Sequence, residues 1–330
     1  MSLEHSWYRG AGWLKLLRPV SLLFQFLSAR RRLSKTAAQW RAPVPVIVVG
    51  NITVGGSGKT PVTLALIEML RERGYRPGVV SRGYGAKAPY YPYPVTPETS
   101  VADGGDEPCL IAQRTGVPVF IDPDRPAGVR ALLESGDCNI VISDDGLQHY
   151  ALARDVEIAV IDAGRGLGNG RCLPEGPLRE PPERLLQVDR VILNGAGAFA
   201  FNGATQMRLK PACLIELASG QKVSPDQWSE SRKVHALAGI GHPARFFDTL
   251  RALGFDPIEH PLADHAELSH EQLRLSPALP LIMTEKDAVK CRGWAPSGCW
   301  SLRVEAQFDN GFESWLDSRL NSLKQKYGSP

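Results

Sequence analysis

A glycine-rich turn that ends in lysine and threonine is the part of the sequence best suited to binding phosphate. Residues 55–60 read Gly-Gly-Ser-Gly-Lys-Thr, directly after the apolar run 44–49 and before the helical pattern 62–73. Glycines let backbone N–H groups approach oxyanions, and the N-terminus of the following helix adds a partial positive charge. The order of strand, turn and helix predicts a nucleotide phosphate cradle, formed by Thr53, Gly55, Gly56, Ser57, Gly58, Lys59 and Thr60.

Two residues of the phosphate cradle have side chains with a predicted role. Lys59 is expected to reach the β- and γ-phosphates, and the Thr60 hydroxyl is expected to ligate Mg²⁺. Thr53 stands where the usual pattern G-x-x-x-x-G-K-[ST] has its first glycine. The alternative is a glycine-rich turn without a ligand, which any α/β protein can contain.

Adjacent carboxylates follow a second apolar run. The run 140–142 leads into Ser143, Asp144 and Asp145, and Gln148 and His149 follow shortly after. Carboxylates at the end of a strand, in a chain with a phosphate cradle, are placed to hold Mg²⁺ directly or through its waters. Adjacent aspartates repel each other, which favours a divalent cation beside them over an ordinary Asp-Asp-Gly turn.

A third polar stretch is ambiguous from its pattern alone. Asp106, Glu107 and Pro108 precede the helical stretch 109–113. Local rules make Asp106 an N-cap and Pro108 an early helical residue, and nothing in the pattern decides between this cap and a chemical role.

The N-terminal region is aromatic, leucine-rich and basic. Its apolar residues are interleaved with Lys15 and Arg18 and followed by the basic run 30–35; they are Trp7, Tyr8, Trp13, Leu14, Leu16, Leu17, Val20, Leu22, Leu23, Phe24, Phe26 and Leu27. The apolar run is too short and too interrupted to span a bilayer, and its basic residues follow instead of preceding it, unlike a signal peptide. An interfacial helix on an anionic membrane is predicted, and a helix docked on the protein's own core is the alternative.

The elements that we expect to position these residues are short apolar runs that alternate with helical stretches. The runs 78–81, 117–121, 139–143, 156–161 and 191–193 are typical of strands, and 234–240, 281–284 and 300–304 form a second group. This alternation predicts an α/β fold, with a mostly parallel P-loop NTPase-like sheet domain and a second, smaller α/β domain. The pattern loosens around 206–228, where we expect the joint between the domains.

Composition excludes some classes of function. The 330 residues are 43% hydrophobic and 22% charged, which is ordinary for a globular protein, and the length suits two domains. A net charge of +3, without a zinc-finger spacing or a basic stripe, disfavours nucleic-acid binding. The six cysteines include no C-x-x-C pair, which suits reduced thiols in the cytosol.

Several stretches together resemble one family. GNITVGGSGKTP, SRGYG, GGDEP, ISDDGLQHYAL, NGRCLPEGPLRE, GIGHPARFF, ADHAEL and MTEKDAVKC are similar, in content and order, to the tetraacyldisaccharide 4'-kinase family of lipid A biosynthesis. The resemblance covers nearly the whole chain, and it implies that Thr53 is usual at its position. Glu175, where a small residue is expected, and His242, where Asn is expected, depart from the family pattern.

The resemblance implies a reaction and an arrangement. The reaction is transfer of the γ-phosphoryl group of ATP to the 4'-hydroxyl of an acylated glucosamine disaccharide 1-phosphate, at the cytoplasmic face of the bacterial inner membrane. The implied parts are a membrane-interface segment (residues 1–40), a P-loop kinase domain (41–210), a flexible linker (211–231) and a smaller α/β domain (232–330). ATP, Mg²⁺, the lipid substrate and the membrane surface are the implied ligands and partners, and we infer neither nucleic acid nor an obligate protein partner.

By matched position, the resemblance also implies roles for individual residues. Lys59 and Thr60 bind phosphate and Mg²⁺, and the metal shell is Asp144, Asp145 and Gln148. Asp106 becomes the candidate base on the sugar hydroxyl, with Glu107 beside it and His265 in support. Further cleft residues are Arg125, Arg179, Glu180 and, less directly, His149. A loop histidine without a catalytic role remains the alternative for His265.

Three other functions share parts of the sequence. A P-loop GTPase or metallochaperone would have the phosphate cradle, but the stretch 284–287, Thr-Glu-Lys-Asp, has the wrong spacing for guanine recognition. A membrane-recruited nucleotide switch gives no role to GGDEP or to His265. A different cytosolic small-molecule kinase would leave the N-terminal segment without a use.

Overall fold

The computed structural model describes residues 3–136 and 138–329. Its strands are β1 (Val46–Gly50), β2 (Pro77–Ser81), β3 (Tyr93–Val95), β4 (Val119–Ile121), β5 (Ile140–Asp144), β6 (Val156–Asp162), β7 (Arg190–Asn194), β8 (Thr205–Glu216), β9 (Lys222–Val223), β10 (Lys233–Ala238), β11 (Asp256–Pro261), β12 (Leu281–Thr284) and β13 (Cys299–Phe308). Each apolar run predicted as a strand overlaps one of them.

Helices connect most of these strands. The α-helices are α1 (Leu3–Arg9), α2 (Arg18–Ala37), α3 (Lys59–Glu72), α4 (Val101–Gly104), α5 (Asp106–Thr115), α6 (Arg125–Glu134), α7 (Pro243–Ala252), α8 (Glu285–Cys291) and α9 (Gly311–Tyr327). The 3-10 helices are η1 (Gly12–Leu17), η2 (Pro182–Leu186), η3 (Pro225–Gln227) and η4 (Glu271–Leu273).

Within the described residues, thirteen strands form one sheet. The order is β11-β10-β12-β13-β8-β7-β6-β1-β5-β2-β4-β3, and β9 pairs with β8. Neighbours are parallel except in three pairs: β3 with β4, β8 with β13 and β8 with β9. The predicted mostly parallel α/β fold is confirmed. The strand ends next to β1 belong to β5 and β6, so the chain segments after these three strands meet at one edge of the sheet.

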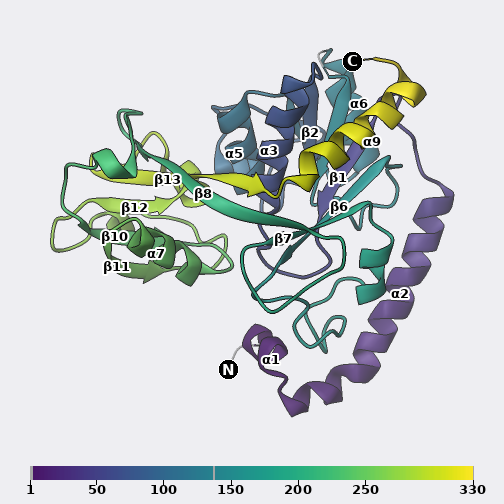
Figure 1. Cartoon of the computed structure of the whole chain (residues 1–330), viewed down its shortest axis with the longest axis horizontal. Coiled ribbons are helices and arrows are strands. Elements are labelled where there is room, and N and C mark those ends of the chain that lie inside the picture. The colour runs from purple at the N-terminus through teal and green to yellow at the C-terminus, as the bar shows by residue number, and fades with distance from the viewer. Residues whose placement is uncertain (1–2, 137, 330) are drawn as a thin grey trace.

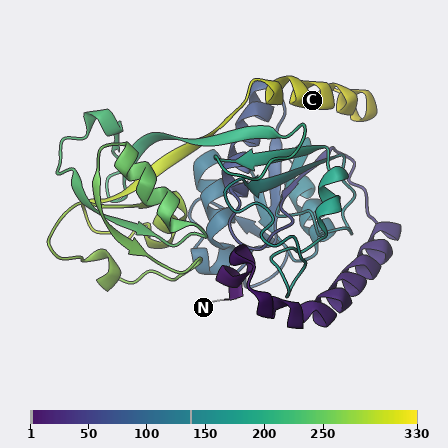
Figure 2. The ribbon, with the colours of Figure 1, turned by 60° about the horizontal axis from the view of Figure 1, so that its bottom comes forward.

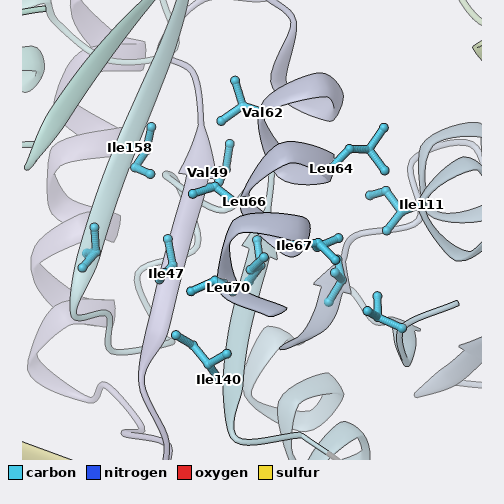
Figure 3. Close-up of a cluster of buried hydrophobic side chains, with 14 of the residues drawn as sticks. Ile47, Val49, Val62, Leu64, Leu66, Ile67, Leu70, Ile111, Ile140 and Ile158 are labelled. Atoms are coloured by element: carbon cyan, nitrogen blue, oxygen red, sulfur yellow. The ribbon is translucent and has the colours of Figure 1, made fainter. Parts of the chain in front are cut away.

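The centre of the sheet is buried on both faces. Ile47 and Val49 of β1 pack in a cluster with α3 (Figure 3). Val46 and Val48, which point the other way, pack in a second cluster with α6. Because both faces are covered, β1 is a continuous apolar run and does not alternate with polar residues. This strand is therefore a rigid support for the phosphate cradle at its carboxyl end.

The molecule has a larger and a smaller lobe, and β8 and β13 run from one to the other (Figure 1). β8 starts parallel to β7 in the larger lobe and then pairs antiparallel with β13, from Met207 and Phe308 to Glu216 and Trp300. The predicted linker, residues 211–231, contains the second half of β8 together with β9 and η3. The division of the chain into domains at these boundaries stays a prediction.

The N-terminal segment, residues 3–37, follows the outside of the larger lobe (Figures 1 and 2). Trp7 and Leu14 are buried, and the Ser21 hydroxyl donates to the carbonyl oxygen of Cys172 at 2.8 Å. The other side of the segment carries apolar side chains that are each more than half exposed, namely Leu16, Val20, Leu22, Leu23, Phe26, Leu27 and Leu33. The segment therefore has one face docked on the protein and one apolar face directed outward. Among the described residues, no helix is long and apolar enough to cross a membrane.

Candidate active site

The phosphate cradle connects β1 to α3. Gly58 is the N-cap of α3, and its φ of 92° lies in the left-handed region that favours glycine. A Cβ at this position would lie 2.2 Å from Nδ2 of Asn194, which leaves no room for a larger residue. The same Nδ2 donates to the carbonyl oxygen of Ser57 at 3.0 Å. Asn194, the last residue of β7, thus holds the phosphate cradle in place. The backbone N–H groups of the cradle can then face a ligand.

Lys59 begins α3 and is buried at the edge of the main cavity, which has a volume of about 570 Å³. Its Nζ lies 3.5 Å from Oδ1 of Asp145. Thr60 lines the same cavity. The structure therefore places Lys59 beside Asp145, one of the two predicted carboxylates, and Thr60 in the same cavity.

Asp144 and Asp145 end β5 in different environments. The carboxyl of Asp144 is fully buried: its Oδ1 accepts from the Thr63 hydroxyl at 3.0 Å, and its Oδ2 has no partner among the described residues. Burial and the charge of Glu107 raise the pKa of Asp144 to about 7. Burial also opposes ionisation of Asp145, but the charges of Lys59 and Arg179 outweigh it and hold its pKa well below the ordinary value. Asp145 is therefore a carboxylate at neutral pH.

These groups fit Mg²⁺ in chemistry. A buried carboxylate oxygen without a partner, a second carboxylate and the hydroxyl of Thr60 are all hard oxygen ligands. In the part of the chain that the structure describes, no group of three or more His, Cys, Asp or Glu side chains could hold a metal ion by itself. A Mg²⁺ ion at this edge would therefore share its ligands with nucleotide phosphates and water, as this ion commonly does.

Gln148 faces a different partner. Its Nε2 donates to the carbonyl oxygen of Asn51 at 3.0 Å and to Oε2 of Glu180 at 2.8 Å. The buried Glu180 also accepts a hydrogen bond from the Tyr150 hydroxyl. Gln148 is thus hydrogen-bonded to Glu180, and its Oε1 accepts from Nη1 of Arg179 at 3.5 Å. A direct role of Gln148 in the metal shell stays a prediction.

Asp106 and His265 meet across the two lobes. Asp106 is the first residue of α5, whose N-cap is Gly105, and its side chain does not cap the helix. Instead, its Oδ2 lies 3.1 Å from Nδ1 of His265, although the two residues are 159 positions apart. The φ of His265 is 61°, and the Tyr84 ring lies 5.1 Å from the imidazole, centroid to centroid. The local prediction of an N-cap is thus replaced by a contact with the smaller lobe.

Two lysines of α8 lie beside this pair, and neither was expected from the sequence to have a role. Lys290 Nζ lies 3.5 Å from Oδ2 of Asp106. Lys286 Nζ lies 3.3 Å from Oε1 of Glu107 and 3.1 Å from Oδ1 of Asp264. Burial opposes ionisation of Asp106, but the hydrogen bond with His265 and the lysine charges outweigh it and lower its pKa. The spacing of four residues in MTEKDAVKC, which puts both lysines on one side of a helix, was the available signal.

The remaining predicted residues divide between two cavities. Arg179 lines the main cavity, with Nη1 3.1 Å from Oδ2 of Asp145. Arg125, Gln148 and His149 line a second cavity of about 420 Å³. Arg125 is 1% exposed and donates to the carbonyl oxygens of Asp122 and Asp144 at 2.7 and 3.2 Å. Arg125 therefore holds the backbone at Asp144, where β5 ends.

Burial sets the charge of the groups in the second cavity. It lowers the pKa of Arg125 to about 10. Burial and the charge of Arg125 lower the pKa of His149 to about 3, so this imidazole is neutral at neutral pH.

The structure shows the surroundings of Glu175 and His242, the two residues that depart from the family pattern. Glu175 is buried, and its Oε1 lies 3.0 Å from Nη2 of Arg18 at the start of α2. The larger residue therefore has a charged partner in the N-terminal segment. His242 is the N-cap of α7 and lines the main cavity, without a side-chain cap bond.

Comparisons with known proteins agree on one family. A family model described as tetraacyldisaccharide-1-P 4'-kinase matches residues 13–321. A curated tetraacyldisaccharide 4'-kinase from Azotobacter vinelandii is 55% identical, over 97% of this chain and 97% of its own. Another, from Pseudomonas putida (strain GB-1), is 53% identical over the same shares. A crystal structure described as the "apo" form of LpxK from Aquifex aeolicus in complex with ATP aligns with a TM-score of 0.80 and 28% identity, and covers 94% of this chain and 99% of that one.

Proposed function

The chain belongs to the tetraacyldisaccharide-1-P 4'-kinase family, and from this premise we propose that groups from both lobes carry out its reaction together. The protein is an ATP-dependent 4'-kinase of lipid A biosynthesis. Its substrates are ATP and a tetraacylated disaccharide 1-phosphate, and the GTPase and switch alternatives are not favoured. The observation that supports the shared site is the Asp106–His265 contact, which joins α5 of the larger lobe to a loop of the smaller lobe. His265 and Glu107, the neighbour of Asp106, line the main cavity.

The larger lobe binds the phosphates. Phosphoryl transfer asks a protein mainly to position the groups and to supply positive charge to the moving oxygens. In this proposal, the backbone N–H groups of the phosphate cradle and Lys59 hold the β- and γ-phosphates, and Arg179 adds a second positive charge. Thr60, Asp144 and Asp145 would hold Mg²⁺, which when bound neutralises phosphate oxygens.

Asp106 acts on the other substrate. Its lowered pKa keeps it ionised, so its carboxylate can accept the proton of the 4'-hydroxyl as the phosphoryl group transfers. His265 fixes the orientation of this carboxylate through the 3.1 Å hydrogen bond. Lys290 and Lys286 stabilise the ionised form, and Glu107 balances the charge of Lys286.

Direct transfer of label tests the reaction. The purified protein is incubated with γ-labelled ATP, Mg²⁺ and a detergent-dispersed acylated glucosamine disaccharide 1-phosphate. We expect label in the lipid and none in a substrate that lacks the 4'-hydroxyl. Label released only as inorganic phosphate, with the lipid present, would contradict the assignment.

A membrane surface is the second partner that we propose. Seven apolar side chains of η1 and α2 face outward. The exposed Arg30, Arg31 and Lys35 follow in α2, and Arg31 and Lys35 also border the second cavity. An aromatic and leucine surface with a cationic flank is suited to the anionic cytoplasmic face of a bacterial inner membrane. The lipid substrate lies in such a surface, so the segment would bring enzyme and substrate into one plane.

The double variant Arg30→Gln/Arg31→Gln is expected to weaken binding to anionic vesicles. Each basic residue near an anionic surface contributes about 1 kcal/mol at low salt, so the loss should reach roughly 30-fold in partitioning. Arg32 is retained, because its Nη2 donates to Oε1 of Gln187 at 2.6 Å and has a structural partner.

Vesicle flotation at low and high salt measures this loss. The matched control is Arg208→Gln/Lys210→Gln, which removes the same charge from exposed positions of β8. Equal flotation of both variants, at both salt concentrations, would contradict the proposal that the basic residues of α2 contribute to membrane binding.

A further inference from the structure

Arg165 lies where three parts of the molecule meet. It belongs to the loop after β6, and its backbone N–H donates to Oδ1 of Asp162 at 3.0 Å. Helix α1 lies beside the junction of the two lobes (Figures 1 and 2). The Arg165 side chain is only 15% exposed, because it is enclosed by α1, by the phosphate cradle and by the loop before α7.

The guanidinium group contacts each of these parts. It forms an ion pair with Glu4 of α1, and its Cζ lies 4.4 Å from the centroid of the Tyr8 ring. Its Nη1 donates to the carbonyl oxygen of Gly241, in the smaller lobe, at 3.5 Å. A Cβ built on Gly55 would lie 3.2 Å from the same Nη1. The guanidinium therefore packs directly against the backbone of the phosphate cradle.

Arg165 differs in position from the phosphate-binding residues of the cradle. It does not line the main cavity among the described residues, whereas Gly55 and Lys59 do. Its effect must therefore pass through the loop. A phosphate-binding loop is rich in glycine and has few side chains of its own to hold its shape, so neighbouring groups must do so. Asn194 supports the loop on one side, and Arg165 packs against it at Gly55.

We propose that Arg165 is a positioning residue through which the docking of α1 favours ATP binding. Glu4 and Tyr8 hold the guanidinium over Gly55, so the segment that is proposed to bind the membrane also prearranges the phosphate cradle. A planar, permanently charged guanidinium suits both an ion pair and a ring contact at once. The coupling is reciprocal by thermodynamic linkage: if docked α1 tightens ATP binding, bound ATP must tighten the docking of α1. This inference rests on the proposed function, because ATP binding is its readout.

Nucleotide binding without lipid tests the coupling. The dissociation constant of Mg²⁺–ATP is measured for the full-length protein in detergent, with no lipid substrate or vesicles present. We expect Glu4→Ala, Tyr8→Ala and Arg165→Ala each to weaken ATP binding about three- to tenfold. The double variant Glu4→Ala/Arg165→Ala should bind ATP no more weakly than Arg165→Ala, because both changes remove one interaction.

Trp13→Ala is the matched control for Tyr8→Ala. Trp13 belongs to the same segment but is 48% exposed, whereas Tyr8 packs on Arg165. The Trp13 variant should bind ATP like the wild type and bind anionic vesicles more weakly. A segment that serves only as an anchor would show the vesicle effect for Trp13 without any ATP effect for Glu4 or Tyr8.

Hydrogen exchange provides the reciprocal measurement. A non-hydrolysable ATP analogue should slow amide exchange in residues 3–9 of the wild type but not of Arg165→Ala, and Arg165→Lys should give an intermediate result. ATP binding within twofold of the wild type for both Glu4→Ala and Tyr8→Ala would overturn the inference. Failure of the wild type itself to bind ATP would instead contradict the proposed kinase function.

Discussion

Lys59→Ala is expected to lower phosphoryl transfer to the lipid by a factor on the order of 10²–10³ or more, with little change in melting temperature. Positioned charges that stabilise a transition state contribute about this much individually. Lys59 is the residue of the phosphate cradle whose charge would lie at the transferring group, and Arg179 sits on the other side of Asp145.

Stability should survive this change because of how Lys59 is paired. Its partner Asp145 keeps Arg179 at 3.1 Å, so that carboxylate retains a counter-charge. Asp144 also loses the favourable charge of Lys59, but its pKa is already raised to about 7, so this buried carboxyl can take up a proton. The Lys59 side chain also borders the main cavity, where water can replace it.

Label transfer to the lipid and thermal melting of the same preparation measure the two effects. Lys222→Ala, which truncates an exposed lysine of β9, is the control and should leave both unchanged. Activity of Lys59→Ala within a few-fold of the wild type would contradict the proposal that the phosphate cradle binds the phosphates of ATP.

The elements of the fold were largely predictable, because their signals are local. β1 and β5 are short apolar runs with polar or glycine-rich ends, and burial on both faces makes such runs continuous. The phosphate cradle was equally predictable, since strand, turn and helix are consecutive in the chain. The full length of β8 was not predictable from the sequence. Its residues are a mixture of buried, half-buried and exposed positions, so no clean period of two extends through 205–216.

The candidate site was predictable only where one segment carries the chemistry. The local pattern at Asp106 predicts a helix cap, and its contact with His265 depends on how a loop of the smaller lobe packs on α5. Lys290 approaches Asp106 only because α8 packs beside α5, and no local rule contains that packing. Arg165 depends on three segments at once, which is why its position was not foreseen.

The second large effect concerns Asp106 and His265. Asp106→Ala and His265→Ala are each expected to lower kcat by a factor on the order of 10²–10⁴, the usual contribution of a positioned base, with little change in ATP affinity. ATP affinity should persist because the phosphate cradle lies between β1 and α3, whereas Asp106 lies in α5 and His265 in a loop of the smaller lobe.

The interaction between the two changes is the sharper measurement. If His265 acts by orienting the Asp106 carboxylate, the second truncation removes nothing that the first has left, and the double variant should be within a few-fold of the poorer single variant. Because the pair spans the two lobes, the base is complete only while they are in contact, which would limit ATP hydrolysis in the absence of lipid. His270→Ala, which truncates an exposed histidine of the same lobe, should leave kcat unchanged. Fully multiplicative losses would show that Asp106 and His265 act independently, and an active His265→Ala variant would reduce that histidine to an ordinary loop residue.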